Sequence, residues 1–228
     1  MIGTIVNVVS VLTGSTLGFI FRGRFPKKIQ TTVIHGISLS VILIGIQMGL
    51  EIKKDYDILL VIFSLVIGAV IGESLGLEER LNNFGKSLKE KFGSQDDLFV
   101  QGFVQSSLIY CVGAMSIMGA IQDGLNNDPS ILFTKSVLDG ITAIAFAAST
   151  GIGVAFSAIP IFLYQGSITL ASGWAAIYLT NDMIRIMTAS GGLLIIAIGL
   201  NLLGATKIKS GNLLPSLLVA LILAHFVF

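Results

Sequence analysis

Long apolar runs separated by short polar segments dominate the chain. Charged residues are missing from six of these runs: residues 2–21, 29–50, 58–72, 98–122, 186–206 and 210–228. Residues 136–181 carry a single charge, Asp139. A helix crosses the ~30 Å hydrocarbon layer of a membrane in about 20 residues, and barrel strands would alternate apolar and polar positions, which these runs do not. The pattern predicts an all-α, polytopic integral membrane protein.

The runs predict about eight transmembrane helices. Their expected bounds are residues 2–21, 29–50, 57–76, 98–121, 132–157, 160–179, 183–205 and 212–227. The fifth and sixth share one long run, where Gly151, Gly153 and Pro160 supply the turn. The first run lacks the basic start and short apolar core of a signal peptide, so we expect it to be retained.

Basic residues favour one orientation of these helices. Ten lysines and arginines fall in one set of alternate loops: Arg22, Arg24, Lys27, Lys28, Arg80, Lys86, Lys89, Lys91, Lys207 and Lys209. The other set has four: Lys53, Lys54, Lys135 and Arg185. Short cytoplasmic loops carry the excess of positive residues. We therefore expect both termini outside the cell membrane.

Residues 77–97 form the one long polar insertion. Leu77, Leu81, Phe84 and Leu88 fall on one face of a helix, with charged residues elsewhere. This spacing predicts an amphipathic helix on the inner leaflet, or otherwise a solvated linker helix.

The second and seventh runs resemble each other. Residues 44–50 align with 198–204, and 39–43 with 193–197; with a gap of three, 10–21 also match 167–178. Helices 1–3 (residues 1–76) would then repeat as helices 6–8 (residues 160–228) around a central pair (98–157). An odd number of crossings separates the copies, so the repeat would be inverted, as in many transporter folds. Chance similarity between apolar, glycine-rich helices is the alternative.

Composition excludes several classes of protein. The 228 residues have a mean hydropathy of +0.89 and 12% charged residues, about half the usual share of a soluble domain, and a net charge of +1 gives no footprint for nucleic acid. One cysteine and two histidines leave no disulfide framework and no ordinary zinc site. We expect no cofactor.

Polar side chains at membrane depth are costly and are therefore the functional candidates. Nine are singled out: Asn7, Gln47, Gln105, Ser116, Asp123, Asp139, Thr142, Gln165 and Asn201. Oxygen ligands of this kind suit a hydrated or partly dehydrated cation, and no buried arginine or lysine pair is expected to hold an anion. Asn7 and Gln47 are expected toward the outer face, and Gln165 and Asn201 toward the inner face.

Structural interpretations of the same residues stay open. Asp123 can lie at a helix end in water, and Asp139 can pair with Lys135 one turn earlier. The four amides, Asn7, Gln47, Gln165 and Asn201, can simply bond between helices. A dyad of Ser190 and His225 is geometrically possible, but Ser190 lacks a glycine two residues before it and neither aspartate follows Gly-x-Gly. We expect no enzymatic activity.

Three motifs carry a family resemblance. Residues 3–7 (GTIVN), 111–124 (CVGAMSIMGAIQDG) and 135–140 (KSVLDG) are similar to the bacterial membrane family known as domain of unknown function 554, with YdfK- and YqgA-like members. The resemblance covers nearly the whole chain. It implies an inner-membrane protein of prokaryotes with a transport role, in which we favour sodium.

Together these features predict a channel or secondary transporter for a small inorganic cation, with Na⁺ preferred. Asp123 and Asp139 would attract the cation at the outer mouth. Asn7, Gln47, Ser116 and Thr142 would replace its hydration, and Gln165 and Asn201 would line the inner exit. One alternative is a small-solute exporter, which needs a roomy apolar pocket. Another is a non-transporting scaffold or partner protein, in which Asp139 is paired internally. Stripes of small residues also suggest a homodimer.

Overall fold

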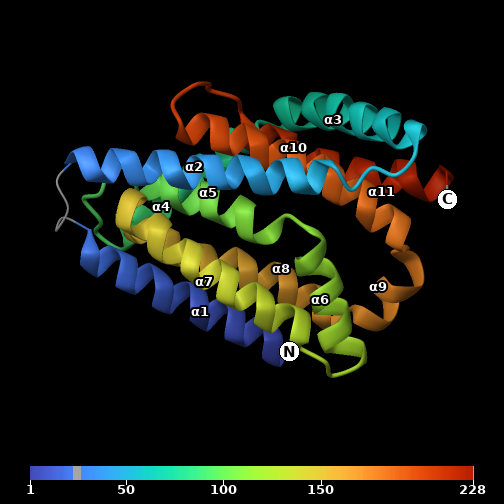
Figure 1. The fold of residues 1–228 in the computed structure, drawn as a ribbon, viewed down its shortest axis with the longest axis horizontal. Coiled ribbons are helices and arrows are strands. Elements are labelled where there is room, and N and C mark those ends of the chain that lie inside the picture. The colour runs from blue at the N-terminus through green and yellow to red at the C-terminus, as the bar shows by residue number, and fades with distance from the viewer. Residues whose placement is uncertain (23–26, 228) are drawn as a thin grey trace. The chain divides into compact units, whose positions relative to one another are not determined.

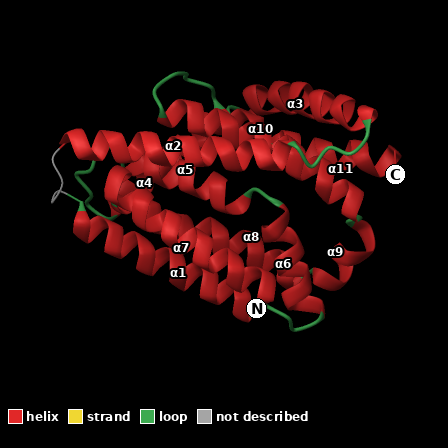
Figure 2. Ribbon diagram, viewed as in Figure 1, coloured by secondary structure: helices red, strands yellow, loops and turns green. Residues whose placement is uncertain are grey.

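A computed structural model describes residues 1–22 and 27–227, and within these ranges the chain forms helices, turns and loops without a strand (Figure 2). The helices of the first half are α1 (Ile2–Phe21), α2 (Lys27–Gly49), α3 (Asp55–Leu75), α4 (Leu77–Lys91), α5 (Phe99–Cys111) and α6 (Ala114–Leu125). Those of the second half are α7 (Ser130–Thr150), the 3₁₀ turn η1 (Ile152–Ser157), α8 (Ala158–Leu170), α9 (Ser172–Tyr178), α10 (Asn181–Leu202), η2 (Ser210–Leu213) and α11 (Pro215–Val227). The predicted all-α fold is confirmed.

Within the described ranges, seven helices are long and apolar enough to cross a membrane. They are Ile2–Phe21, Thr31–Gly49, Tyr56–Leu75, Ser130–Thr150, Ile152–Leu170, Asn181–Leu202 and Ser210–Val227. The bent pair α5 and α6 makes an eighth if it counts as one span. The protein is therefore a multi-pass membrane protein.

The predicted fourth span, residues 98–121, is not one straight helix. α5 and α6 meet at an angle of 61°. The cause is Gly113, whose φ of +133° is a conformation that other residues rarely adopt. The hydroxyl of Ser116 donates to the carbonyl oxygen of Tyr110 at 3.0 Å and so links the two halves across the break.

The boundary between the fifth and sixth spans also differs from the prediction. α7 ends at Thr150, because Gly151 takes a φ of +90°, and the next span already begins at Ile152. Pro160 lies in the first turn of α8, where a missing backbone N–H costs little, so it does not mark a turn between spans. This earlier start places every residue of α8 further along its crossing than the sequence suggested.

The chain folds as two compact units. Unit 1 comprises Met1–Ile37, Asn82–Cys111 and Met115–Ala176, and unit 2 comprises Ser38–Leu81, Val112–Ala114 and Ile177–Phe228. The division predicted from the repeat, with breaks after residues 76 and 157, stays a prediction.

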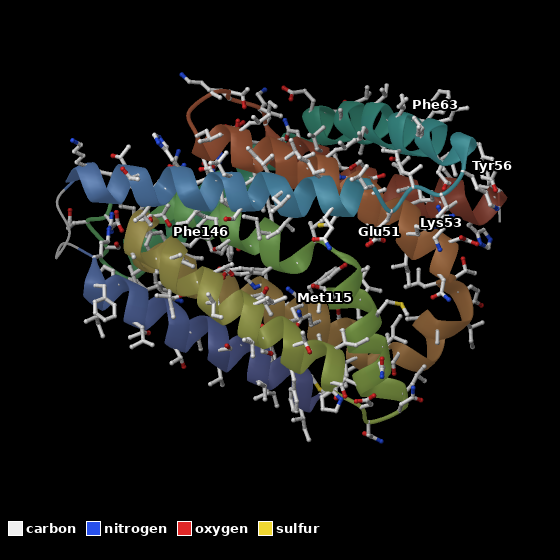
Figure 3. The ribbon with its side chains drawn as sticks, viewed as in Figure 1. Glu51, Lys53, Tyr56, Phe63, Met115 and Phe146 are labelled. Carbon is white, nitrogen blue, oxygen red and sulfur yellow. The ribbon has the colours of Figure 1, made fainter. Side chains whose placement is uncertain are left out.

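In unit 1, α1 runs alongside α7 (Figure 1). The buried face of α1 carries small and polar residues: Gly3, Thr4, Asn7, Val11, Gly14, Ser15 and Gly18. A Cβ atom at Gly14 or Gly18 would collide with a carbonyl oxygen of α7. Small residues on this face therefore let the two backbones approach closely, while Phe146 of α7 fills the core (Figure 3).

In unit 2, α10 is largely buried and packs against α3 and α11. Gly68 and Gly72 of α3 lie against the backbone of Ser216 and Asn212, with no room for a Cβ. The opposite face of α3 is apolar and open: Phe63 is 55% exposed (Figure 3). Small residues inside and large apolar residues outside are what a lipid environment requires.

The crossing of α2 and α10 in unit 2 has a reciprocal pattern. A Cβ at Gly45 would lie 2.6 Å from the carbonyl oxygen of Gly192, and 2.7 and 2.8 Å from Cγ1 and N of Ile196. A Cβ at Gly199 would lie 3.1 Å from the carbonyl oxygen of Ser38, and 2.6 and 3.2 Å from Cγ1 and N of Ile42. The same three kinds of atom thus surround both glycines.

Ion pairs join helix ends that the charge count assigns to one side of the membrane. In unit 1, Arg22 bonds to Asp96 in the loop after α4, with Nη2 2.9 Å from Oδ1. In unit 2, Lys209 lies 2.5 Å from Glu73 at the end of α3. The Glu73 side chain, through its hydrogen bond and its charge, raises the pKa of Lys209 above the ordinary value. Arg24 lies outside the described residues, and the assignment of sides to cytoplasm and exterior stays a prediction.

Candidate functional site

A buried polar cluster lies within unit 1, where α1, α7 and α8 supply its members. We call it the Asn7 cluster: Asn7, Lys135, Asp139 and Gln165. The amide nitrogen Nδ2 of Asn7 donates to Oδ2 of Asp139 at 3.1 Å and to Oε1 of Gln165 at 3.3 Å. Asn7 and Gln165 are completely buried. Asn7 and Gln165 were expected at opposite ends of a path; they are in contact because the sixth span begins at Ile152, eight residues before the predicted start at residue 160.

The charged half of the cluster is a pair on α7. Nζ of Lys135 lies 2.9 Å from Oδ1 and 2.6 Å from Oδ2 of Asp139, and the two side chains are 8% and 9% exposed. This is the i,i+4 pairing that the sequence left open as an alternative. The lysine is buried as a single cation that a carboxylate neutralises, and not as one of a pair of cations that could hold an anion.

The amides of the cluster keep unused hydrogen-bonding capacity. A carboxylate only accepts, so Asn7 must turn its nitrogen toward Asp139. Its oxygen Oδ1 and the nitrogen Nε2 of Gln165 are then buried without a hydrogen-bond partner. In the described part of the chain no three His, Cys, Asp or Glu side chains gather into a metal site. The oxygens available to a cation are those of one carboxylate, of amides and of hydroxyls.

Further polar contacts follow α1 from the cluster toward its N-terminal end. The hydroxyl oxygens of Thr4 and Thr169 lie 3.4 Å apart, and the backbone N–H of Gly3 donates to Oδ2 of Asp123 at 3.1 Å. The amino group of Met1 is 3.0 Å from the same carboxylate. Asp123 is therefore buried and bonded, and does not stand in water at a helix end. Thr4 was missed, although its three-residue spacing from Asn7 puts both on one helix face.

The broken helix supplies the remaining candidates of unit 1. Gln105 of α5 is buried and its Oε1 has no hydrogen-bond partner, whereas the hydroxyl of Ser116 is used at the helix break. Thr142 is half-buried and donates to carbonyl oxygens of its own helix. Cys111 is the last residue of α5, and α5 packs against α7, the helix that carries the charged pair.

The two remaining candidates belong to unit 2. Gln47 is exposed on α2. Asn201 stabilises the loop that follows α10: its Nδ2 donates to the carbonyl oxygen of Ile208, and its Oδ1 accepts from the N–H of Ile208 and the hydroxyl of Thr206. Of the nine candidates, Asn7 is hydrogen-bonded to both Asp139 and Gln165. Asp123 lies at the N-terminal end of α1, where it accepts from Gly3.

Unit 2 contains a buried ion pair that the sequence analysis missed. Arg185, expected in an outer loop, lies in the first turns of α10 and is buried. Its guanidinium bonds to Asp57 of α3 and, at 2.7 Å, to Asp182. Asp57 also accepts from the N–H groups of Lys53 and Lys54. These bonds fasten the start of α3 to the start of α10.

Two further features bear on the alternative functions. The hydroxyl of Ser190 lies 2.9 Å from that of Ser64 and donates to the carbonyl oxygen of Ile186, so its partners are not those of a serine–histidine dyad. An entirely apolar groove of about 430 Å³ lies along α1, η1 and α8, lined by residues such as Leu12, Phe162 and Leu163. Because these side chains are exposed on the apolar surface, lipid chains can fill the groove.

Comparison with known proteins places the whole chain in one family. It is 35% identical over 221 residues to "Uncharacterized membrane protein YdfK" of Bacillus subtilis (strain 168), covering 96% of this chain and 93% of that protein. It is 34% identical over 230 residues to "Uncharacterized protein YqgA" of Escherichia coli (strain K12), covering 97% and 95%. No solved structure matches. The model of the family "Protein of unknown function (DUF554)" matches residues 2–225, and the chain belongs to that family.

Proposed function

We propose that this protein is a membrane transport protein, a channel or secondary transporter, that passes a small inorganic cation, with Na⁺ as the first candidate. The observation that carries the proposal is the buried carboxylate of Asp139, held by Lys135 and Asn7 inside a membrane helix unit. The proposal includes no enzymatic activity and no cofactor.

The energetic argument starts from the cost of the cluster. A buried ion pair is often no more stabilising than apolar residues of the same volume, and unpartnered amide atoms add a further penalty. A fold that needed only stability would gain by filling this position with apolar side chains. Asn7, Gln165 and Asp139 therefore favour a role in binding, which for a carboxylate beside amide oxygens means a cation.

The broken helix supports the same proposal. Discontinuous helices in transporters present the partial negative charge of a helix C-terminus to a cation at membrane depth. α5 ends in this way at Cys111, and it packs against α7, which carries Asp139. An inverted repeat would allow the site to open first to one side of the membrane and then to the other.

The α2–α10 crossing supports that repeat. A shift of 154 residues, the one that aligns residues 44–50 with 198–204, carries Gly45 to Gly199, Ser38 to Gly192 and Ile42 to Ile196. Under this shift, each atom that lies near Gly45 corresponds to an atom of the same kind near Gly199. Chance similarity of two apolar helices would align residues without exchanging their contacts.

A non-transporting scaffold is the second candidate, and the Lys135–Asp139 pair favours it, because a scaffold would keep that carboxylate paired internally. The two functions differ in flux. The full chain in proteoliposomes would be assayed for Na⁺ and K⁺ uptake, comparing wild type with Asp139→Asn. Asp97→Asn is the matched control, since Asp97 is fully exposed.

Transport predicts uptake by wild type and the control, and a loss of at least tenfold in Asp139→Asn. Equal uptake by wild type and Asp139→Asn would assign the flux to another path. If none of the three proteins takes up Na⁺ or K⁺, the non-transporting scaffold would be the remaining candidate function.

A further inference from the structure

The ammonium of Lys135 occupies the position that a cation bound to Asp139 would take. Nζ lies 2.9 and 2.6 Å from the two carboxylate oxygens, so it contacts both. The two residues are one helical turn apart on α7, and both side chains are nearly buried. The carboxylate is thus never far from a positive charge supplied by its own helix.

The cluster also contains an oxygen that this ammonium leaves unused. Oδ1 of Asn7 belongs to the amide that donates to Asp139, and it is buried without a partner. A lysine offers three N–H donors, and those described here are directed at the carboxylate. A small metal cation coordinates more oxygens than an ammonium bonds, so it could use both the carboxylate and this amide oxygen.

A displaced lysine stays tethered beside the site, because Lys135 and Asp139 are one helical turn apart on α7. The flexible four-carbon stem of lysine allows its ammonium to leave Asp139 without unfolding α7.

From these contacts we infer that Lys135 is a tethered competitor for the cation site: its ammonium fills the site when no substrate is bound, and the transported cation must displace it from Asp139. This inference rests on the proposed function. A monovalent cation replaces the ammonium charge for charge, whereas a divalent cation would leave an excess positive charge in a buried site. The substrate class is therefore a monovalent metal cation.

Two substitutions shift the competition in opposite directions. Lys135→Met removes the competitor and leaves a buried carboxylate without its partner. Lys135→Arg strengthens the competitor, because a guanidinium binds a carboxylate through two parallel hydrogen bonds and keeps its charge. Lys135→Arg preserves the ion pair and so remains informative if Lys135→Met does not fold.

The test measures the midpoint of thermal unfolding of the purified full chain at increasing NaCl, with choline chloride holding the ionic strength constant. We expect Na⁺ to reach its half-maximal effect at about tenfold lower concentration in Lys135→Met than in wild type, and at severalfold higher concentration in Lys135→Arg. The midpoint of the double variant Lys135→Met/Asp139→Asn should not change with the Na⁺ concentration. The same order is expected for the half-saturating Na⁺ concentration of uptake.

A merely structural role of Lys135 would lower the midpoint without moving the half-maximal Na⁺ concentration. If uptake depends on Asp139 but the half-maximal concentrations of wild type and Lys135→Arg agree, the competitor inference fails and the proposed function stands. If wild type neither takes up Na⁺ nor responds to it, both fail.

Discussion

Asn7 and Asp139 lie 132 residues apart in the sequence and are joined by a hydrogen bond of 3.1 Å from the amide of Asn7 to the carboxylate. Both belong to unit 1, where α1 and α7 share a long interface. The bond links the helix that supplies small residues to the helix that supplies the charge.

Replacing Asn7 by leucine should destabilise the protein and weaken Na⁺ uptake together. The substitution removes two hydrogen bonds and leaves Gln165 and one carboxylate oxygen with fewer partners, at a cost of about 1–3 kcal/mol. Thermal unfolding and proteoliposome uptake measure the two effects. Thr16→Val is the control on the same helix, because Thr16 is exposed and its hydroxyl donates to the carbonyl oxygen of Leu12 one turn earlier. Unchanged stability in Asn7→Leu would mean that the bond contributes nothing.

Gly113 should not tolerate a side chain. Its φ of +133° separates α5 from α6, and alanine in such a conformation costs on the order of 1–3 kcal/mol. Gly113→Ala should therefore lower the midpoint of thermal unfolding by several degrees. Gly36→Ala lies within α2 with open space around it and should leave the midpoint the same or higher. Equal midpoints in the two variants would argue that α5 and α6 form one continuous helix.

Gly45→Ala and Gly199→Ala should have similar effects. Each added methyl group would meet a carbonyl oxygen, an isoleucine Cγ1 and an isoleucine backbone nitrogen across the α2–α10 crossing. We expect both variants to lose about 1–3 kcal/mol, the usual cost of overpacking. Gly49→Ala should lose none, since a Cβ added there meets no atom within 4 Å. A large loss in one of the two with none in the other would contradict the reciprocal crossing.

Arg185→Ala should be among the most destabilising substitutions in unit 2. It would leave the completely buried carboxylate of Asp57 without its cation, which costs about 3–5 kcal/mol. Arg185→Lys should restore part of this stability, because lysine keeps the charge but not the planar set of donors. Denaturation in detergent compares both variants with Arg80→Ala, which changes an exposed arginine. A loss in Arg185→Ala no larger than in Arg80→Ala would show that the pair does not fasten α3 to α10.

The sequence predicted the membrane helices well because the cost of burying charge in lipid acts over whole runs of residues. α1 ends directly before the charge of Arg22, and the bounds of α3 and α10 lie within three residues of the predicted spans 57–76 and 183–205. The helix break at Gly113 was not predicted, and Gly151 was only one of three residues predicted to supply the next turn, because a glycine permits a positive φ without requiring it.

The site was predicted less completely for a related reason. The polarity of Asn7, Asp139 and Gln165 identified them individually, but their contact depends on where α8 begins. An error of several residues there moved Gln165 to the wrong depth. Arg185 was placed outside because its partner Asp57 lies 128 residues away, a distance over which sequence spacing carries no information.

The most direct measurement of the central claim is equilibrium binding of radioactive Na⁺ to the purified full chain, with wild type, Asp139→Asn and Asp97→Asn compared at equal ionic strength. If the Asp139 carboxylate holds the transported cation, wild type and Asp97→Asn bind Na⁺ saturably and Asp139→Asn does not. Saturable binding to Asp139→Asn with unchanged affinity, or none to wild type, would contradict it.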